Sequence, residues 1–109
     1  MKILHLDDEN YPKEIINNLI SNFDFTSHNQ LKLRDSNDLK NHLNFNSYDI
    51  IFVKLGFYFD EEMLQNQSNL KFIITPTTGL NHLDLNYLYR KKVQIISLKG
   101  EYSFLNNIQ

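Results

Sequence analysis

The sequence predicts an α/β sandwich of three layers, a five-stranded parallel sheet of order 2-1-3-4-5 with helices on both faces. Short apolar runs alternate along the chain with segments whose apolar residues recur at helical spacing. Three of the runs are continuous and rich in β-branched or aromatic residues, which is typical of strands buried on both sides. Because crossovers are short and right-handed, this alternation favours the flavodoxin-like topology.

The predicted strands are five short runs separated by the helical segments. Residues 2–6, 50–54, 71–75 and 94–98 are the stronger candidates, and the alternating run 30–33 is the weakest. All of them are bounded by polar or turn-forming residues. These five runs supply the whole sheet of the predicted sandwich.

Four helices are predicted between the strands, each from a start signal. Pro12 suits the first position of a helix over 12–22. Ser36 is a candidate cap for 36–43, where Leu39 and Leu43 share one face. Acidic residues open the third helix, 60–65, and Asp84 is expected to cap the fourth, 85–92.

The bulk composition describes one ordinary folded domain over residues 1–109. Hydrophobic residues make up 41% of the chain and charged residues 22%, so global disorder is not expected. The net charge of -2 provides no broad basic surface, which argues against nucleic-acid binding. Cysteine is absent, and no run approaches the roughly 18 apolar residues of a membrane span. We therefore expect a cytoplasmic protein without a membrane partner.

The residues that follow the strands are the first place to look for chemistry. In open α/β sheets, ligands bind beyond the carboxyl ends of the strands. Three segments lie there in the predicted fold: residues 7–9, with the sequence DDE, residues 54–56, and residues 75–79.

The first of these segments resembles the opening of response-regulator receiver domains. Asp7 and Asp8 stand where a receiver holds Mg²⁺, and Lys99 and Thr75 stand for its lysine and its switch hydroxyl. Lys54, however, occupies the end of the third strand, where a receiver needs a phosphate-accepting aspartate. A degenerate receiver without that aspartate remains an alternative. The simpler interpretation of residues 7–9 is that acids complement the following helix.

The later part of the chain resembles the D-2-hydroxyacid dehydrogenases. Residues 69–85 read NLKFIITPTTGLNHLDL, similar to the family's fourth strand, its glycine-containing loop and its helix entry. Residues 87–98 continue like the next helix and strand, and 99–105 resemble phosphoglycerate-dehydrogenase-like members. Upstream, residues 48–54 match the third strand. One departure is Lys92, where the family commonly has a glycine that closes the helix.

The resemblance implies a site for the substrate carboxylate. It places Thr77, Thr78 and Gly79 in the loop that holds this anion, where a turn with exposed N–H groups suits an anion. Lys54 is the second candidate, as a point charge for a carboxylate or phosphate. The alternatives are a plain loop and a lysine whose charged end only reaches solvent. His82, two residues before an aspartate, is expected to be structural, and no metal site is predicted.

The same resemblance implies that catalysis needs a second domain. Hydride transfer belongs to a nicotinamide cofactor, NAD in the full-length enzyme. The glycines here, Gly56, Gly79 and Gly100, form no G-x-G-x-x-G motif. The family's NAD-binding Rossmann domain also carries its catalytic residues, and these positions are missing from this chain. We therefore expect the substrate-binding domain of an NAD-dependent oxidoreductase, truncated and inactive alone.

The expected partners are a small 2-hydroxy acid and the missing NAD-binding domain. A third alternative is a freestanding interaction domain without a ligand. In that case, helix faces that normally meet the missing domain would be exposed, which favours association into a homodimer.

Overall fold

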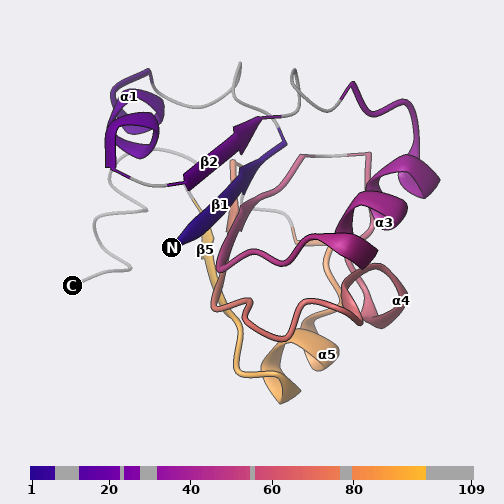
Figure 1. Cartoon of the computed structure of the whole chain (residues 1–109). Helices are drawn as coiled ribbons and strands as arrows, with labels where there is room; N and C mark the ends of the chain where they lie inside the picture. Colours follow the sequence, from indigo (N-terminus) through magenta and orange to yellow (C-terminus); the bar gives the residue numbers. More distant parts are fainter. Residues whose placement is uncertain (7–12, 23, 28–31, 55, 77–79, 98–109) are drawn as a thin grey trace.

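The computed structural model describes residues 1–6, 13–22, 24–27, 32–54, 56–76 and 80–97 (Figure 1). Strands and helices alternate throughout this part of the chain. In order they are β1 (Lys2–His5), α1 (Lys13–Asn22), β2 (Asp24–Ser27), α3 (Ser36–Phe45), β3 (Ile50–Phe52), α4 (Glu61–Leu64), β4 (Phe72–Thr75), α5 (Leu85–Arg90) and β5 (Gln94–Ser97).

The predicted fold class is confirmed. The five strands form one sheet of order β2-β1-β3-β4-β5, and every neighbouring pair is parallel. Helix α1 lies on one side of the sheet, and α3, α4 and α5 lie on the other (Figure 1). This is a flavodoxin-like three-layer arrangement, with the carboxyl ends of all five strands at the same edge.

The predicted position of the second strand was wrong. The alternating run 30–33 predicted it, whereas β2 is Asp24–Ser27, separated from α1 by a single residue. Phe25 and Thr26 are good strand formers, and Phe25 packs beside His5 of β1. Leu33 instead packs against the main core from outside the sheet. Gln30 and Leu31 of the predicted run lie outside the described residues.

Aspartates begin three of the helices. Asp35, one residue earlier than the predicted Ser36, caps α3 by accepting a hydrogen bond from the Asp38 N–H at 3.0 Å. A second contact supports the start of α3 at this point: the Asp38 carboxylate accepts hydrogen bonds from the Arg34 backbone N–H and guanidinium, both at 2.9 Å. Asp60 caps α4, and Asp84 caps α5 as predicted. Pro12 lies outside the described residues.

The main core fills the space between the sheet and α3–α5. Leu4 of β1, Ile51 of β3 and Ile73 of β4 point into it, together with Leu39 and Leu43 of α3. Each fully buried side chain of this size contributes roughly 1.5–3 kcal/mol. This core fixes the edge of the sheet from which the candidate site is built.

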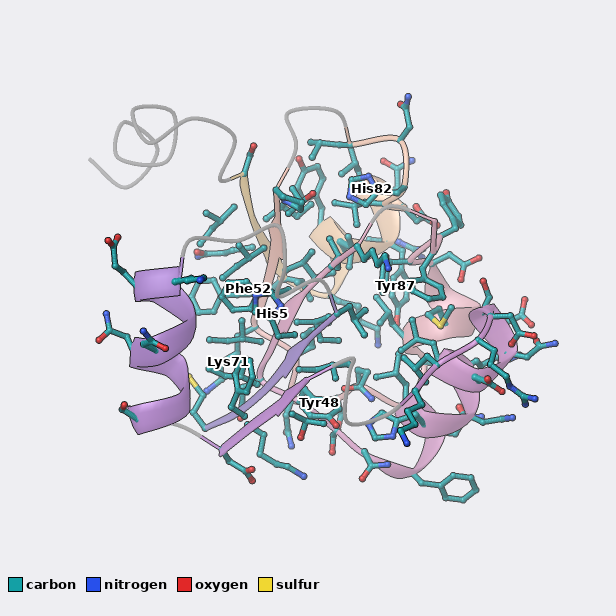
Figure 2. The ribbon with its side chains drawn as sticks, turned by 90° about the horizontal axis from the view of Figure 1, so that it is seen from above. His5, Tyr48, Phe52, Lys71, His82 and Tyr87 are labelled. Atoms are coloured by element: carbon teal, nitrogen blue, oxygen red, sulfur yellow. The ribbon has the colours of Figure 1, made fainter. Side chains whose placement is uncertain are left out.

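A smaller cluster covers the face of the sheet on the α1 side. Ile3 and Phe52 are buried there, with Phe25, Ile50 and Ile74 packed around them. His5 shares this face and stacks on Phe52, with ring centroids 4.5 Å apart (Figure 2). The two faces of the central strands are therefore both covered, as continuous apolar runs predict.

Candidate functional site

The carboxyl ends of β1, β3 and β4 are held side by side. The Leu6 N–H donates to the Phe52 carbonyl at 2.9 Å, and the Val53 N–H donates to the Ile74 carbonyl at 2.8 Å. Phe52 pairs with Ile74 in the register of the sheet. The bond from Val53 to Ile74 places the residue before Lys54 beside the end of β4. The two predicted site segments therefore begin next to each other.

Lys54 lies two residues beyond the end of β3, after Val53, and is half-buried. Gly56 follows closely, with φ +106°, a backbone conformation that side-chain-bearing residues rarely adopt. A sharp turn thus follows the lysine at the sheet edge. Thr77, Thr78 and Gly79 lie outside the described residues, as do Asp7, Asp8, Glu9 and Lys99.

Residues 80–83 form a turn that follows the predicted loop in the sequence. The Leu83 N–H donates to the Leu80 carbonyl at 3.1 Å, and the Leu80 side chain packs against the main core. Phe59 anchors this turn to the β3–α4 connection, because its N–H donates to the His82 carbonyl and its carbonyl accepts from the Asp84 N–H, both at 2.9 Å. The turn is fixed before α5 begins.

His82 links this turn to the end of β4. Its Nε2 lies 3.0 Å from the Thr75 Oγ1, a hydrogen bond between two buried side chains. Burial lowers the pKa of the His82 imidazole, so the neutral ring is favoured. The sequence predicted a structural role at the helix entry for His82 but not this partner. Thr75 ends β4 and His82 lies in the turn before α5, so no single helical or strand period relates the two residues.

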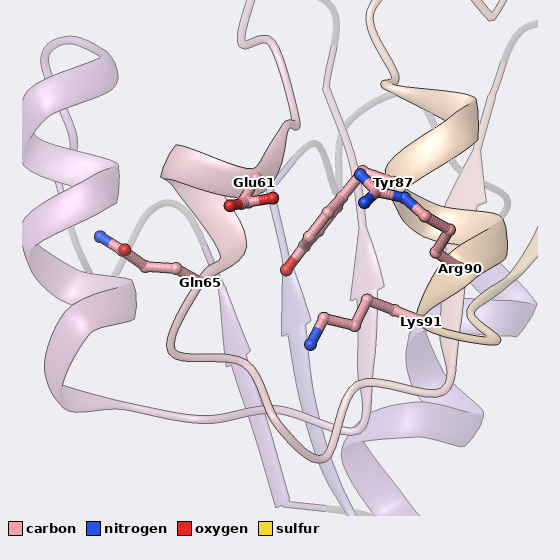
Figure 3. Close-up of a pocket in the computed structure, with 5 residues that line it drawn as sticks. All are labelled: Glu61, Gln65, Tyr87, Arg90 and Lys91. Carbon is pink, nitrogen blue, oxygen red and sulfur yellow. The ribbon is translucent and has the colours of Figure 1, made fainter.

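An open cavity of about 410 Å³ lies between α4 and α5, and none of the predicted site residues lines it. Figure 3 shows Tyr87, Arg90 and Lys91 on one side of it and Glu61 and Gln65 on the other. The pKa of Tyr87 is raised by burial and then by the Glu61 charge, while Arg90 partly offsets this. The phenol therefore stays protonated, and the cavity offers both signs of charge without a buried charged group.

Two further findings concern the described residues only. Among them, no group of three or more His, Asp or Glu side chains is arranged to hold a metal ion. In the same part of the chain, no helix has the length and apolar character needed to cross a membrane.

Sequence comparison matches residues 3–103 to the family model described as D-isomer specific 2-hydroxyacid dehydrogenase, catalytic domain. A curated relative is the erythronate-4-phosphate dehydrogenase of Wigglesworthia glossinidia brevipalpis, which is 32% identical over 80 residues. The match covers 72% of this chain but 21% of the relative. The chain thus spans about a fifth of the length of that protein.

Solved structures show the same fold. The apo form of D-mandelate dehydrogenase from Rhodotorula graminis superposes with a TM-score of 0.69 at 16% identity, over 91% of this chain and 31% of that one. D-lactate dehydrogenase from Aquifex aeolicus, solved with NAD and lactic acid, gives a TM-score of 0.61 at 20% identity, over 91% and 28%. This chain therefore corresponds in fold to less than a third of each.

Proposed function

Since its match over residues 3–103 shows that the chain belongs to the D-isomer specific 2-hydroxyacid dehydrogenase family, we propose that it is the substrate-binding domain of an NAD-dependent member. In this proposal the full-length enzyme transfers a hydride between nicotinamide and a 2-hydroxy or 2-oxo acid. The 109-residue chain alone binds the acid and does not catalyse the reaction.

The observation that carries the proposal is the position of Lys54. The lysine follows β3 at the sheet edge, next to the strand end that leads into residues 77–79. A 2-hydroxy acid presents a carboxylate, which needs cationic or N–H donors. We assign the charge to Lys54 and the remaining donors to Thr77, Thr78 and Gly79. Their shared role is to hold the carboxylate so that C2 faces the cofactor.

Cofactor binding falls to a second domain in this proposal. Nicotinamide supplies the hydride chemistry when it is bound. The glycines of this chain do not form the G-x-G-x-x-G turn that lets a backbone approach a pyrophosphate, so its residues do not fit a dinucleotide. The chain covers about a fifth to a third of its relatives, which leaves room in such enzymes for that domain.

The substrate class follows from the relatives' names and from the charge at the edge. Erythronate 4-phosphate and lactic acid are both 2-hydroxy acids, and the relatives are named for or solved with them. Lys54 suits either a carboxylate or a phosphate. The comparisons do not favour the receiver alternative, and Lys54 stands where that function requires an aspartate.

Titration of the isotope-labelled chain with D-lactate and with D-erythronate 4-phosphate, followed by amide NMR, tests the assignment. We expect shifts to concentrate at residues 53–56 and 75–82. Lys54→Met should weaken binding of either acid about ten- to a hundredfold, because a charge-assisted hydrogen bond supplies roughly 1.5–3 kcal/mol.

Lys71→Met is the matched control. Lys71 is exposed and precedes β4, so it lies at the opposite edge of the sheet. It should bind both acids as the unmodified chain does. Equal binding by Lys54→Met and the unmodified chain would contradict the site, and absence of any acid-dependent shift would contradict the function.

A further inference from the structure

The cavity between α4 and α5 is built from residues that the proposed substrate site does not use. Its volume is about 410 Å³, and its lining consists of polar and charged side chains: Glu61, Gln65, Tyr87, Arg90 and Lys91 (Figure 3). Arg90 and Lys91 come shortly before Gln94, the first residue of β5. This end of the cavity therefore lies away from the carboxyl edge of the sheet, where the acid is proposed to bind.

The two sides of the cavity start from one hydrogen-bonded junction. The Phe59 N–H donates to the His82 carbonyl, and the Phe59 carbonyl accepts from the Asp84 N–H, both at 2.9 Å. Glu61 follows Phe59 by two residues, at the start of α4. Asp84 caps α5 by accepting a hydrogen bond from the Tyr87 N–H at 3.2 Å. Backbone contacts thus set the spacing of the two helices that carry the lining side chains.

The α5 side of the cavity supplies hydrogen-bond donors. Tyr87 is buried, and its hydroxyl reaches into the cavity (Figure 3). The Arg90 guanidinium lies over the Tyr87 ring, 5.9 Å from its centroid, a contact that favours one placement of this long side chain. The Lys91 N–H donates to the Tyr87 carbonyl at 3.1 Å and holds Lys91 at the end of α5. Two cations and a phenol therefore share this side.

The α4 side supplies an anionic acceptor. Glu61 lies in the first turn of α4, and Gln65, which follows the helix, adds a neutral amide. The Glu61 charge raises the pKa of Tyr87 and the Arg90 charge lowers it, so both charges act on the same hydroxyl. A ligand in the cavity would meet a negative charge on one side and positive charges on the other.

These charges select a ligand that carries both signs. A small anion would be repelled by Glu61, and a small cation by Arg90 and Lys91, because like charges placed together reduce affinity. We propose that the cavity binds a small zwitterion of the α-amino acid type, its carboxylate held by Arg90, Lys91 and the Tyr87 hydroxyl and its ammonium group by Glu61. The volume agrees with a small ligand, since small-molecule sites span roughly 300–1,000 Å³.

Amide NMR of the labelled full chain tests the inference with three matched probes. L-Alanine carries both charges, propionate carries only the carboxylate, and ethylamine at neutral pH carries only the ammonium group. We expect L-alanine to give saturable shifts at residues 61–65 and 87–91. Each single-charge probe should bind there about three- to tenfold more weakly, because it lacks one charged contact while water still competes at the exposed side chains.

Two variants test the two sides of the cavity separately. Glu61→Gln should weaken L-alanine binding about three- to tenfold without weakening that of propionate. Lys91→Met should weaken the binding of both probes. Lys92→Met is the control, because the cavity lining in the described part of the chain does not include Lys92. It should bind both probes as the unmodified chain does.

The inference would be overturned by any of three results: no saturable L-alanine shift at residues 61–65 and 87–91, propionate binding there as tightly as L-alanine, or equal L-alanine binding by Glu61→Gln and the unmodified chain. D-lactate binding at Lys54 tests the proposed function separately, and neither result decides the other.

Discussion

His5 is a histidine without exposed surface, stacked on Phe52 and flanked by Phe25 in the sheet face toward α1. Burial lowers its pKa from 6.5 to about 4, because a charged imidazole is poorly solvated there. The folded chain therefore holds a neutral ring over a range in which the unfolded chain binds a proton. The contribution of the neutral His5 ring to the free energy of unfolding is complete above pH 6.5 and falls as the pH drops toward 4.

His5→Phe should remove the part of the pH dependence that comes from His5 while it retains the aromatic stacking, and His42 and His82, whose pKa values burial also lowers, should supply the remainder. Between pH 7 and pH 5 the unmodified chain should lose about 2 kcal/mol through this one group, since each pKa unit corresponds to about 1.36 kcal/mol. Urea unfolding at four pH values across this interval measures the slope. Asp38 and Glu62, whose pKa values are lowered by Arg34 and Lys40, titrate mainly below the interval.

The comparison variant is His42→Phe. Burial also lowers the pKa of His42, followed by the Lys2 charge, but this residue is only half-buried. Most of the slope should remain in that variant. If His5→Phe kept the slope of the unmodified chain, the burial argument would be wrong.

At the scale of secondary-structure elements, the end of α5 shows how a departure from the family pattern is accommodated. The Val93 N–H donates to the Leu88 carbonyl at 2.9 Å and the Lys92 N–H to the Tyr89 carbonyl at 3.0 Å, the two bonds of a Schellman cap. Lys92 occupies the left-handed position of this cap, with φ 61°. The missing glycine thus left the cap intact, at the cost of a strained lysine.

Lys92→Gly should raise the free energy of unfolding by about 0.5–1 kcal/mol, because glycine adopts a positive φ without a steric penalty. For a chain of this size the melting temperature should rise by several degrees. Differential scanning fluorimetry measures the shift. Lys91→Gly is the control: φ is -86° at Lys91, so glycine should give no gain there. If the Lys92→Gly variant were no more stable than the unmodified chain, the claim that Lys92 is strained would be wrong.

At the scale of the whole molecule, the sequence predicted the topology because buried strands and amphipathic helices leave distinct apolar patterns. The position of Lys54 was predictable for the same reason, since it ends a continuous apolar run. The contacts between elements distant in the sequence were not. His82 and Thr75 meet because two connections share one sheet edge, and only the folded chain shows this.

Gln67, away from the site, also makes contacts between distant elements that the sequence does not reveal. Its side chain is buried, accepts from the Tyr48 N–H at 2.9 Å, and donates to the carbonyls of Leu43 and Asn46 at 2.8 and 2.7 Å. It thereby ties the α3–β3 connection to the segment after α4. A glutamine in a polar stretch gives no sign of burial in the sequence, because its satisfaction depends on backbone groups about twenty residues away.

The central claim is that this chain binds the acid and leaves the cofactor to another domain. Amide NMR of the same labelled chain, titrated in parallel with D-lactate and with NADH, tests it most directly. The account predicts D-lactate-dependent shifts at the carboxyl edge of β3 and β4, and no saturable shift with NADH. Tight NADH binding without a response to D-lactate would contradict the account, because the chain would then be a nucleotide-binding domain.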